Sequence, residues 1–583
     1  MSLYSTLRPN KDEVVAKNGI VTAMQRVSAD SGLKMLKHKG NAIDAAIAVG
    51  FSNTVVEAHM GGIAGQGSML IYSNDENRMV SIDFSAKSPK NSNLDMYKIT
   101  GISREPRTNL IYEVENNENK EGAKAFTVPG TVAGLCLAHE LYGSLPLKYV
   151  MGPAISLAKN GFVATWDLTL YIAEKMDWLN SNPVLRDIWI PNGHPPLSEI
   201  EKVSQPRLGK LLEHISLDGT EAFYTGSYAD SIIKYSKSHG GVLTNEDLSE
   251  YKAVLDKPVS IEYRDFSVST PSAPTGGPTV LETLNLLESK DLIDLGHNSS
   301  EYLHFFTESA RHAFADRYSY LGDWNVAHVP LNGMLSKEYA KEIANQINYD
   351  KTSLEGELTE EPWVYYLTNP IHDPWKYDRN PRPCSSYNKS SFSSNREGGT
   401  THFNVADKSG NFVCCTHYGG WGSGGCITTG NGDFIGGDMF KFIPKAGYVN
   451  SIEGWKRPLC NDAPIMVLKD GVPFFCLGAP GSRRIINRVT QIVLNIIDFG
   501  FSIQDAHRMP TIDASTSKTL VDSRINPHVI NDMVIRGHNV EVLEMSPGTP
   551  SHFARPSGIM YDNDSGFLHG GVEVFGNAVA LGL

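Results

Sequence analysis

The 583-residue sequence lacks most features that mark secreted, membrane-spanning or nucleic-acid-binding proteins. Its seven cysteines are odd in number and irregularly spaced, which is not the pattern of a disulfide framework. No stretch reaches the roughly 18 apolar residues that a membrane-spanning helix needs, and the N-terminus has no apolar core of a secretory signal. We therefore expect a reduced, cytoplasmic protein without a membrane partner.

The sequence has no region in which charges of one sign are concentrated. Acidic residues outnumber basic ones by 65 to 52, which gives a net charge of -13 at pH 7 without a long run of either sign. Nucleic acid attracts basic surfaces, so it is not an expected partner. With 41% hydrophobic and 20% charged residues, the composition is that of a globular protein with a large core.

A glycine-rich loop at 61 to 67, G-G-I-A-G-Q-G, invites comparison with a dinucleotide-binding fingerprint. The spacing differs, and residues 68 to 73 predict a strand where a nucleotide site needs the N-terminus of a helix. Residues 41 to 51, before the loop, are alanine-rich with apolar residues at helical spacing, which predicts a buried helix. The sequence thus implies no nucleotide, and it points to no other cofactor.

A second glycine turn lies nearer the C-terminus. Residues 472 to 477 predict a strand, G-A-P-G-S-R-R follows, and the apolar residues from 485 to 497 fall on one broad helical face that Gly500 can end. A strand, a glycine turn and a helix start together present backbone N–H groups to an anion. An ordinary connection between a strand and a helix is the alternative interpretation.

Residues 355 to 399 interrupt the regular pattern, because proline, serine and asparagine dominate their second half. Such a segment predicts a long loop or a mobile tail. Order resumes at Thr400, where T-T-H-F-N-V-A and F-V-C-C-T-H predict two strands joined by the turn D-K-S-G-N. The simplest interpretation is that Gly398 and Gly399 add flexibility and that the threonines favour a strand.

A threonine at a new N-terminus would support a different chemistry. Its hydroxyl is a poor nucleophile until a base removes the proton, and a free α-amine with a pKa of about 7.7 to 8 suits that role at neutral pH. Thr400 gains this amine only if the chain is cut before it. Its own hydroxyl can make the cut by attacking the Gly399 carbonyl, through an ester that water opens, and glycine tolerates the bent backbone.

The junction G-G-T-T-H (398 to 402) followed by D-K-S-G-N resembles the self-cleavage site of the gamma-glutamyltransferase family, whose members are N-terminal nucleophile hydrolases. Collinear similar stretches cover nearly the whole chain. They are G-N-A-I-D-A-A-I-A-V-G (40 to 50), the loop at 61 to 67, P-G-T-V-A-G (129 to 134), Y-G-S-L-P-L (142 to 147), A-F-Y-T-G (222 to 226), G-G-V-L-T-N-E-D-L (240 to 248), A-D-R-Y-S-Y-L-G-D (315 to 323), K-R-P-L (456 to 459) and G-A-P-G-S-R-R-I (478 to 485).

The resemblance implies an α+β fold, a four-layer αββα sandwich built from a large fragment (1 to 399) and a small fragment (400 to 583). The two fragments would form one composite unit, a heterodimer either alone or within a larger oligomer. Thr400 would be the nucleophile and the autoprocessing residue. The family's oxyanion glycine pair falls on Gly481 and Ser482, where the backbone N–H groups are retained. The implied activity is that of a self-processing amidohydrolase or acyltransferase acting on a small amide.

The positions with which the family grips a γ-glutamyl substrate are changed in this sequence. Ser85 stands where the resemblance leads us to expect an arginine that binds the substrate carboxylate. Tyr418 and Gly420 fall near the family's threonine and asparagine beyond the second strand. Its serine pair after R-P-L becomes Cys460 and Asn461.

The largest change is a reversal of charge. Lys441, in G-G-D-M-F-K-F together with Asp438, aligns with the family's aspartate that meets the substrate ammonium. A cation there would repel an ammonium by several kcal/mol if water is excluded, and would attract an acyl group bearing a carboxylate and no amine. We predict an altered acyl pocket for a small amide with a free carboxylate, similar to the oxamate amidohydrolase or cephalosporin acylase branches. In the alternative, Lys441 simply points to solvent.

Other functional classes remain as alternatives. Cys414, Cys415 and His417 suggest a metal site or a cysteine nucleophile, but in a strand Cys415 and His417 share one face while Cys414 points away. Two ligands do not form a zinc site, so we predict no bound metal. A true gamma-glutamyltransferase acting on glutathione, and a catalytically silent binding protein on the same fold, are the remaining alternatives.

Overall fold

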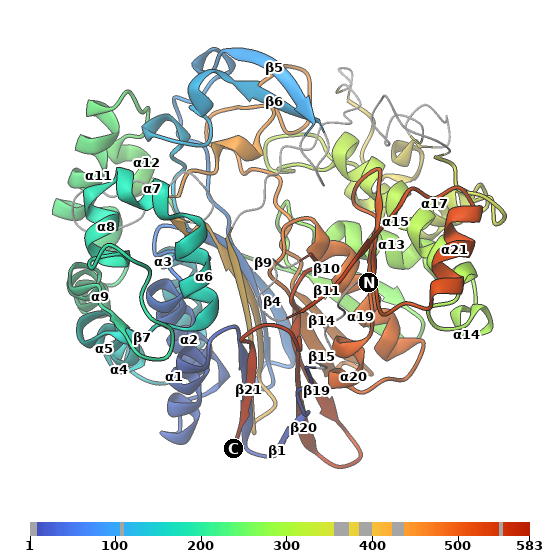
Figure 1. The fold of residues 1–583 in the computed structure, drawn as a ribbon, viewed down its shortest axis with the longest axis horizontal. Helices are drawn as coiled ribbons and strands as arrows, with labels where there is room; N and C mark the ends of the chain where they lie inside the picture. The colour runs from blue at the N-terminus through green and yellow to red at the C-terminus, as the bar shows by residue number, and fades with distance from the viewer. Residues whose placement is uncertain are drawn as a thin grey trace, which may run out of the picture.

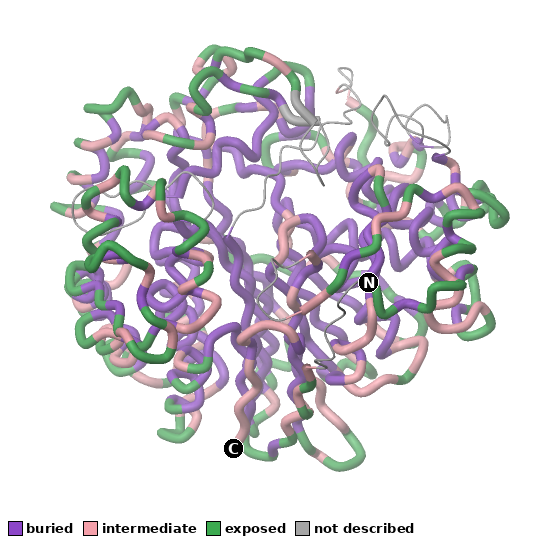
Figure 2. Tube along the Cα trace, viewed as in Figure 1, coloured by how far each residue is buried: buried purple, intermediate pink, exposed green. Residues whose placement is uncertain are grey.

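Two seven-stranded sheets lie face to face, and helices cover both outer faces (Figure 1). The computed structural model describes residues 9–104, 110–354, 366, 372–383, 387, 399–421, 436–546 and 552–583. The predicted four-layer αββα sandwich is confirmed. Its two middle layers are mostly buried, as Figure 2 shows.

We name the two sheets after a central strand of each. The β15 sheet has the strand order β1 (Val14–Ala16), β20 (Phe567–Val572), β19 (Ser557–Asp562), β15 (Val472–Gly478), β14 (Ile465–Lys469), β11 (Phe266–Thr270) and β10 (Val259–Tyr263). The β12 sheet has the order β21 (Val579–Gly582), β2 (Gly19–Ala23), β12 (Thr400–Asp407), β13 (Phe412–Tyr418), β3 (Gln66–Ser73), β4 (Arg78–Phe84) and β9 (Val254–Asp256). Within each sheet, all neighbouring strands are antiparallel.

Three smaller sheets lie outside these layers. They are β5 (Ile99–Arg104) with β6 (Leu110–Val114), β7 (Phe162–Val163) with β8 (Lys202–Val203), and the group β16 (Ile512–Asp513), β17 (Thr519–Asp522) and β18 (Val540–Leu543).

Both large sheets combine strands from before and after residue 400. In the β12 sheet, β2, β3, β4 and β9 precede Thr400, whereas β12, β13 and β21 follow it. In the β15 sheet, β1, β10 and β11 come from the earlier part of the chain. A cut before Thr400 would therefore produce two fragments that both contribute strands to each large sheet, which agrees with one composite unit.

One helical layer covers the β12 sheet and appears on the left of Figure 1. It contains α1 (Arg26–Lys37), α2 (Ala42–Val56), α3 (Thr131–Tyr142), α4 (Leu147–Val150), α5 (Gly152–Asn160), α6 (Trp166–Glu174), α7 (Met176–Ser181), α8 (Pro183–Trp189), α9 (Pro206–Asp218), α10 (Glu221–Tyr224), α11 (Gly226–Ser238) and α12 (Asn245–Glu250).

The other helical layer covers the β15 sheet. It contains α13 (Gly277–Leu287), α14 (Leu292–Leu295), α15 (Ser300–Tyr320), α16 (Leu331–Met334), α17 (Lys337–Ala344), α19 (Arg484–Ile497), α20 (Ile503–Arg508) and α21 (Pro527–Ile535).

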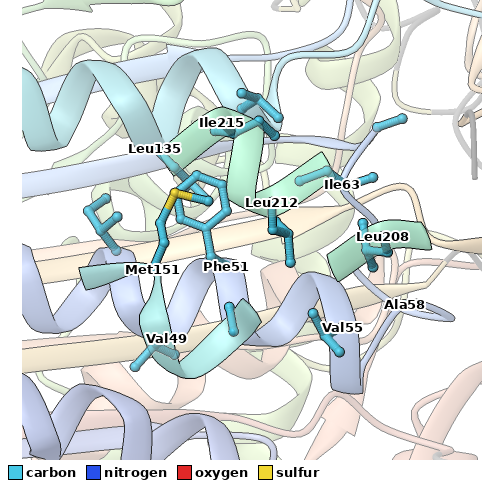
Figure 3. Close-up of a cluster of buried hydrophobic side chains, with 14 of the residues drawn as sticks. Val49, Phe51, Val55, Ala58, Ile63, Leu135, Met151, Leu208, Leu212 and Ile215 are labelled. Carbon is cyan, nitrogen blue, oxygen red and sulfur yellow. The ribbon is translucent and has the colours of Figure 1, made fainter. Parts of the chain in front are cut away.

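Helix α2 is the central helix of the first layer, and all of its residues are buried. Its many alanines allow close packing on every side, and a capping box between Asn41 and Asp44 begins the helix. Figure 3 shows Phe51 of α2 among buried apolar side chains, with Leu135 and Met151 nearby. The helix predicted at 41 to 51 is thus confirmed, and it continues to Val56.

The other predicted elements are also confirmed. The strand expected at 472 to 477 is β15, the helix expected at 485 to 497 is α19, and the hairpin at Thr400 is β12 with β13. Strand β3 follows the loop at 61 to 67, so no helix N-terminus stands where a pyrophosphate would bind. In the described ranges, no helix combines the length and apolar character that crossing a bilayer requires.

The segment predicted as a mobile tail, 355 to 399, lies largely outside the described residues. Of its described part, His372 is fully buried, and its Nδ1 atom lies 2.9 Å from Asp316 Oδ1 on α15. Tyr320 donates a hydrogen bond to the His372 carbonyl at 2.8 Å.

Candidate active site

Thr400 is the first residue of β12 and forms one end of a row of side chains across the β12 sheet. It pairs directly with Tyr418, the last residue of β13, and Tyr418 pairs with Gln66, the first residue of β3. Directly paired residues point to the same face of a sheet. Because Gly67 pairs with Phe84 at the end of β4, Ser85 lies next in this row, just beyond the strand.

The end of β15 approaches this row from the opposite sheet. Cys414 donates from Sγ to the Leu477 carbonyl at 3.4 Å, and a Cβ atom placed on Gly478 would lie 2.4 Å from the His402 ring. Cys414 pairs with Asn404. As β15 runs from Leu477 to Gly478, it therefore passes from the neighbourhood of Asn404 to that of His402, in the direction of Thr400. The turn after Gly478 therefore begins beside His402, two residues from Thr400.

Gly481 and Ser482 lie in that turn, immediately before α19. Gly481 has φ +147°, and a Cβ atom there would meet Ala554 at 2.5 Å, so glycine is required. Ser482 has φ +57°, a left-handed conformation that costs a non-glycine residue on the order of 1 kcal/mol or more. Its carbonyl accepts from the Ile485 N–H at 3.1 Å, as helix α19 begins.

Lys441 approaches the row that contains Thr400 and Tyr418 from a 3₁₀ turn, Met439–Lys441, and we call the surroundings of this row the acyl pocket. Its Nζ atom lies 4.2 Å from the centre of the Tyr418 ring and 2.8 Å from Asp438 Oδ1. Lys441 is 7% exposed and Asp438 2%. The alternative that Lys441 points to solvent is therefore wrong, because it is a buried ammonium with a carboxylate partner and an aromatic face beside it.

Gln66 joins the members of this pocket through its side-chain amide. Its Nε2 atom donates to Asp438 Oδ2, and its Oε1 atom accepts from the Ala86 N–H at 2.9 Å. The Tyr418 hydroxyl lies 3.3 Å from Gln66 Oε1, and Cys460 Sγ lies 3.8 Å from the same atom. The structure thus brings together Tyr418, Asp438, Lys441 and Cys460 around a glutamine that sequence analysis did not select.

Asp462 carries a second buried carboxyl group close to Tyr418. Asp462 Oδ2 accepts a hydrogen bond from Ser68 Oγ at 2.6 Å. Burial raises the pKa of Asp462 to about 6, although hydrogen bonds from Ser68 and Tyr418 act against this. Burial also acts to lower the pKa of Lys441, but the attraction of Asp438 outweighs it and raises that pKa above its usual value. Lys441 is therefore charged at neutral pH.

Ser85 lies beside the ion pair that Asp83 forms with Arg457, so this arginine is not an unpaired cation. Its N–H donates to Asp83 Oδ1 at 2.8 Å, and Asp83 Oδ2 lies 2.8 Å from Arg457 Nε. Arg457 also lies 3.7 Å from Asp323. Arg457, which shares Asp83 with Ser85, therefore already has two carboxylate partners.

The remaining two predicted residues occupy different surroundings. Asn461 is partly exposed, and its Oδ1 atom accepts from Arg317 Nη2 at 3.0 Å. Gly420 lies against the other side of the β12 sheet, because its N–H donates to the Met60 carbonyl at 3.1 Å. A Cβ atom on Gly420 would lie 2.4 Å from the Ala58 carbonyl, so its role is close backbone packing.

The alternative nucleophiles and metal ligands are not grouped in space. Cys414 packs in the core between the sheets, whereas Cys415 packs against the helical layer, as alternation along a strand predicts. Burial lowers the pKa of His402 and that of His417 to about 3, so neither is an effective base at neutral pH. Burial raises the pKa of the Cys460 thiol to about 12, which keeps it protonated. Within the described ranges, no three His, Cys, Asp or Glu side chains gather as metal ligands do.

Sequence reasoning missed Gln66, Ser68 and Asp462. Alternation offered one signal, since Gln66 and Ser68 occupy positions i and i+2 of a strand and so share a face. The sequence did not show which segments pack against this polar face. In the structure they are β13 and the segment before β14.

Comparisons with known proteins agree with this architecture. The family model described as "Gamma-glutamyltranspeptidase" matches residues 28–582. The chain is 31% identical to the "Glutathione hydrolase proenzyme" of Escherichia coli (strain K12), covering 94% of this chain and 90% of the relative. It is also 31% identical to the "Acylase ACY 1 proenzyme" of Pseudomonas sp. (strain V22), covering 91% and 88%. The crystal structure of a cephalosporin acylase from Bacillus halodurans superposes with a TM-score of 0.83 at 24% identity, covering 100% of this chain and 99% of that chain, which shows the shared fold.

Proposed function

The chain belongs to the gamma-glutamyltranspeptidase family and is an enzyme of the amide hydrolase or acyltransferase type, and we propose that it processes itself and uses Thr400 as its nucleophile. The names of both relatives contain the word "proenzyme", which supports a precursor that must be cut. The position of Thr400 at the first residue of β12, directly after the closely packed Gly399, supports the cut at this bond.

Self-cleavage requires only the chain and water. The Thr400 hydroxyl attacks the Gly399 carbonyl carbon, the C–N bond to Thr400 breaks, and the hydroxyl proton passes to the nitrogen that becomes the amine. Water then opens the ester, which leaves a Gly399 carboxylate and a Thr400 with a free hydroxyl and a free amine. The 399-residue and 184-residue fragments would remain together, because both sheets draw strands from each.

In the mature enzyme, the freed Thr400 amine would act as the base for the Thr400 hydroxyl, which attacks the amide carbonyl of the substrate. The backbone N–H groups of Gly481 and Ser482 would stabilise the oxyanion, and the turn that holds them begins beside His402, two residues from Thr400. Water or an amine then takes the acyl group from the threonine ester. His402, with its pKa held near 3 by burial, is poorly suited to replace the amine.

The acyl group would lie against the Tyr418 ring and the buried Lys441. This is the observation that carries the specificity proposal: an ammonium lies 4.2 Å from the ring of the residue that pairs with Thr400. The α-ammonium of a γ-glutamyl group would meet Lys441, whereas a carboxylate without an amine could share the Lys441 protons with Asp438. We infer an acyl pocket that disfavours γ-glutamyl groups and accepts small amides bearing a free carboxylate.

The cut is tested by producing the full chain and separating it on a denaturing gel. Scaling the mass of 64.0 kDa by the fragment lengths gives bands of about 44 and 20 kDa. Thr400→Ala should remain whole, and Thr400→Ser, which keeps a hydroxyl and gains the same amine, should be cut. A wild-type chain that stays at 64 kDa after long incubation would refute Thr400 as the nucleophile.

Glutathione hydrolysis is the second candidate function, because the Escherichia coli relative carries that name. A silent binding protein is the third, and the changed acyl pocket is the observation that favours it. Turnover of glutathione or of small carboxylate-bearing amides separates the three. A cytoplasmic location also remains a proposal, for which the free thiols of the described cysteines are the supporting observation.

A further inference from the structure

The turn that follows α2 supports both strands of the Thr400 hairpin. The Met60 and Gly61 N–H groups donate to the Glu57 carbonyl at 2.7 and 2.9 Å, which closes residues 57–61 into a compact turn. A Cβ atom on Gly399 would lie 2.4 Å from the His59 carbonyl of this turn. The Trp421 N–H, just after β13, donates to the Ala58 carbonyl at 3.0 Å. Residues 57–61, which we call the α2 turn, thus contact the chain on both sides of the Thr400–Tyr418 pair.

Glu57 makes the side-chain contact between this turn and β12. Thr401 Oγ1 donates to Glu57 Oε2 at 2.5 Å, and Asn53 Nδ2 lies 3.5 Å from the same hydroxyl oxygen. Glu57 is 3% exposed and Thr401 is fully buried. At the other end of α2, the Ala42 N–H donates to Asp407 Oδ2 at 2.8 Å. Helix α2 is therefore attached to β12 near both ends of the strand, with Glu57 at the end that carries Thr400.

Alternation along β12 places the side chains of Thr400 and Thr401 on opposite faces. A hydrogen bond that holds Thr401 on the helical face therefore fixes the peptide that joins the two residues, and with it the direction of the Thr400 side chain on the other face. We propose that Glu57 is a positioning residue that, through Thr401, orients the Thr400 hydroxyl for attack on the Gly399 carbonyl. This inference rests on the proposed self-cleavage.

The surroundings of Glu57 make this contact sensitive to pH. Burial raises the pKa of Glu57 to about 7; the hydrogen bond from Thr401 acts against this shift, Asp167 adds to it and Arg555 opposes it. Burial lowers the pKa of His59, in the same turn, to about 4.

His417, which pairs with Thr401 across β12 and β13, has its pKa lowered by burial to about 3. Both histidines are therefore neutral above pH 6, where Glu57 ionises. The ionised carboxylate accepts a charge-assisted hydrogen bond from Thr401, which is stronger than the bond to the neutral acid.

The test follows the cut in the full-length chain. The chain is synthesised in a cell-free reaction, synthesis is stopped, and the sample is shifted to buffers between pH 6 and pH 8.5. The rate of appearance of the 44 and 20 kDa bands is then measured for wild type and for Glu57→Gln. We expect the wild-type rate to rise through about pH 7, and the Glu57→Gln rate to be about tenfold or more lower, without that inflection.

One further pair of variants and one unrelated variant control this experiment. Thr401→Ser keeps the hydroxyl and should cut at nearly the wild-type rate, whereas Thr401→Val removes it and should behave like Glu57→Gln. Glu140→Gln, on the exposed face of α3, should change nothing. If Glu57→Gln does not fold, the comparison of Thr401→Ser with Thr401→Val decides the question, with folding checked by circular dichroism.

The outcomes separate the two proposals. A wild-type chain that is not cut at any pH contradicts the proposed function itself. A wild-type chain that is cut, together with a folded Glu57→Gln or Thr401→Val chain cut at the same rate and with the same pH profile, overturns the role of Glu57 and leaves Thr400 as the nucleophile.

Discussion

Lys441 Nζ and Asp438 Oδ1 lie 2.8 Å apart in an ion pair that is almost wholly buried beside the Tyr418 ring. Because of this pair, Lys441 is not an isolated cation before a substrate binds. Asp438 already neutralises it and is itself held by the Gln66 amide. A carboxylate-bearing acyl group must compete with Asp438 for the Lys441 protons, so the two residues together should set the strength of the preference.

The pocket predicts a clear order of substrates. Amides of small dicarboxylic acids, such as oxamate, succinamate or glutaryl anilide, should be cut faster than γ-glutamyl-p-nitroanilide or glutathione. The physical reason is that Lys441 repels the α-ammonium of the γ-glutamyl group and attracts a second carboxylate. The measurement is kcat/KM across this panel with mature wild-type enzyme. Robust turnover of γ-glutamyl substrates would contradict the inferred pocket, and silence across the panel would favour a binding protein.

Changing the two members of the ion pair should move that preference in opposite directions. Lys441→Met keeps a similar volume and removes the cation, so the ratio of dicarboxylic to γ-glutamyl kcat/KM should fall about tenfold or more. Asp438→Asn removes the competing carboxylate, so the same ratio should rise. Lys441→Asp should also lower the ratio, but it places a second buried carboxyl beside Asp438 and should destabilise the fold by several kcal/mol. Equal ratios in wild type, Lys441→Met and Asp438→Asn would show that the pair does not contact the acyl group.

Ser482→Gly should leave turnover almost unchanged. The proposed oxyanion contact at this position is the backbone N–H, which glycine keeps, whereas loss of such a donor can cost about 10² to 10³ in rate. The φ of +57° is also easier for glycine, so the free energy of unfolding should stay within about 1 kcal/mol of wild type. The measurements are kcat for a good amide substrate and thermal denaturation. A hundredfold loss of kcat would instead show that the serine hydroxyl takes part.

Gly399→Ala should slow the cut, because the added methyl group would lie 2.4 Å from the His59 carbonyl and 2.7 Å from Met60 Cα. Both contacts are with backbone, so the junction itself must move away from the α2 turn. We expect cleavage to slow by about tenfold to a hundredfold in a gel time course. Gly152→Ala is the matched control, since a Cβ atom at Gly152 meets no atom within 4 Å. Cleavage of Gly399→Ala as fast as that of this control would contradict a tightly packed junction.

The buried Glu57 also predicts how stability changes with pH. Its pKa is about 7 in the folded chain against 4.5 for an ordinary glutamate, so the folded chain holds the proton more tightly than the unfolded chain. Its contribution to stability is therefore greatest below about pH 4.5 and is lost as pH rises to about 7. The shift corresponds to about 3 kcal/mol.

Glu57→Gln removes this titration and should gain stability relative to its parent as pH rises from 5 to 8. The comparison is made by thermal denaturation in a Thr400→Ala background, where cleavage cannot interfere. A difference between the two chains that stays constant from pH 5 to pH 8 would contradict a raised pKa for Glu57.

Local sequence signals predicted the elements around the cleavage junction well. Strand propensity and turn residues predicted β12, β13 and most of β3 but not its first two residues, and helical spacing predicted α2 and α19. These signals depend on residues that are close together in the sequence, so they can be recognised without knowledge of the fold. The segment from 355 to 399 stays a prediction, since it lies largely outside the described residues.

Contacts within the pocket were less accessible to sequence reasoning. Gln66 and Asp438 are 372 positions apart, and Thr401 and Glu57 are 344 apart, so no local pattern connects them. The prediction that Lys441 faces the substrate pocket came from alignment with a family, and it did not reveal Asp438 as its partner. That pairing is formed within the short 3₁₀ turn, where Lys441 follows Asp438 by three positions and its ammonium lies against the Tyr418 ring.

The sequence by itself determined where a threonine could become a nucleophile, because Gly399, Thr400 and the strand after them are consecutive residues. It also determined several individual strands and helices, since the period of the apolar residues separates the two, whereas the four layers were implied only by the resemblance to a family. Only the tertiary structure decided the charge and protonation of the pocket. Whether Lys441 is a solvated cation or a buried ion pair, and whether Glu57 ionises near pH 4.5 or near pH 7, depends on desolvation by residues from distant parts of the chain.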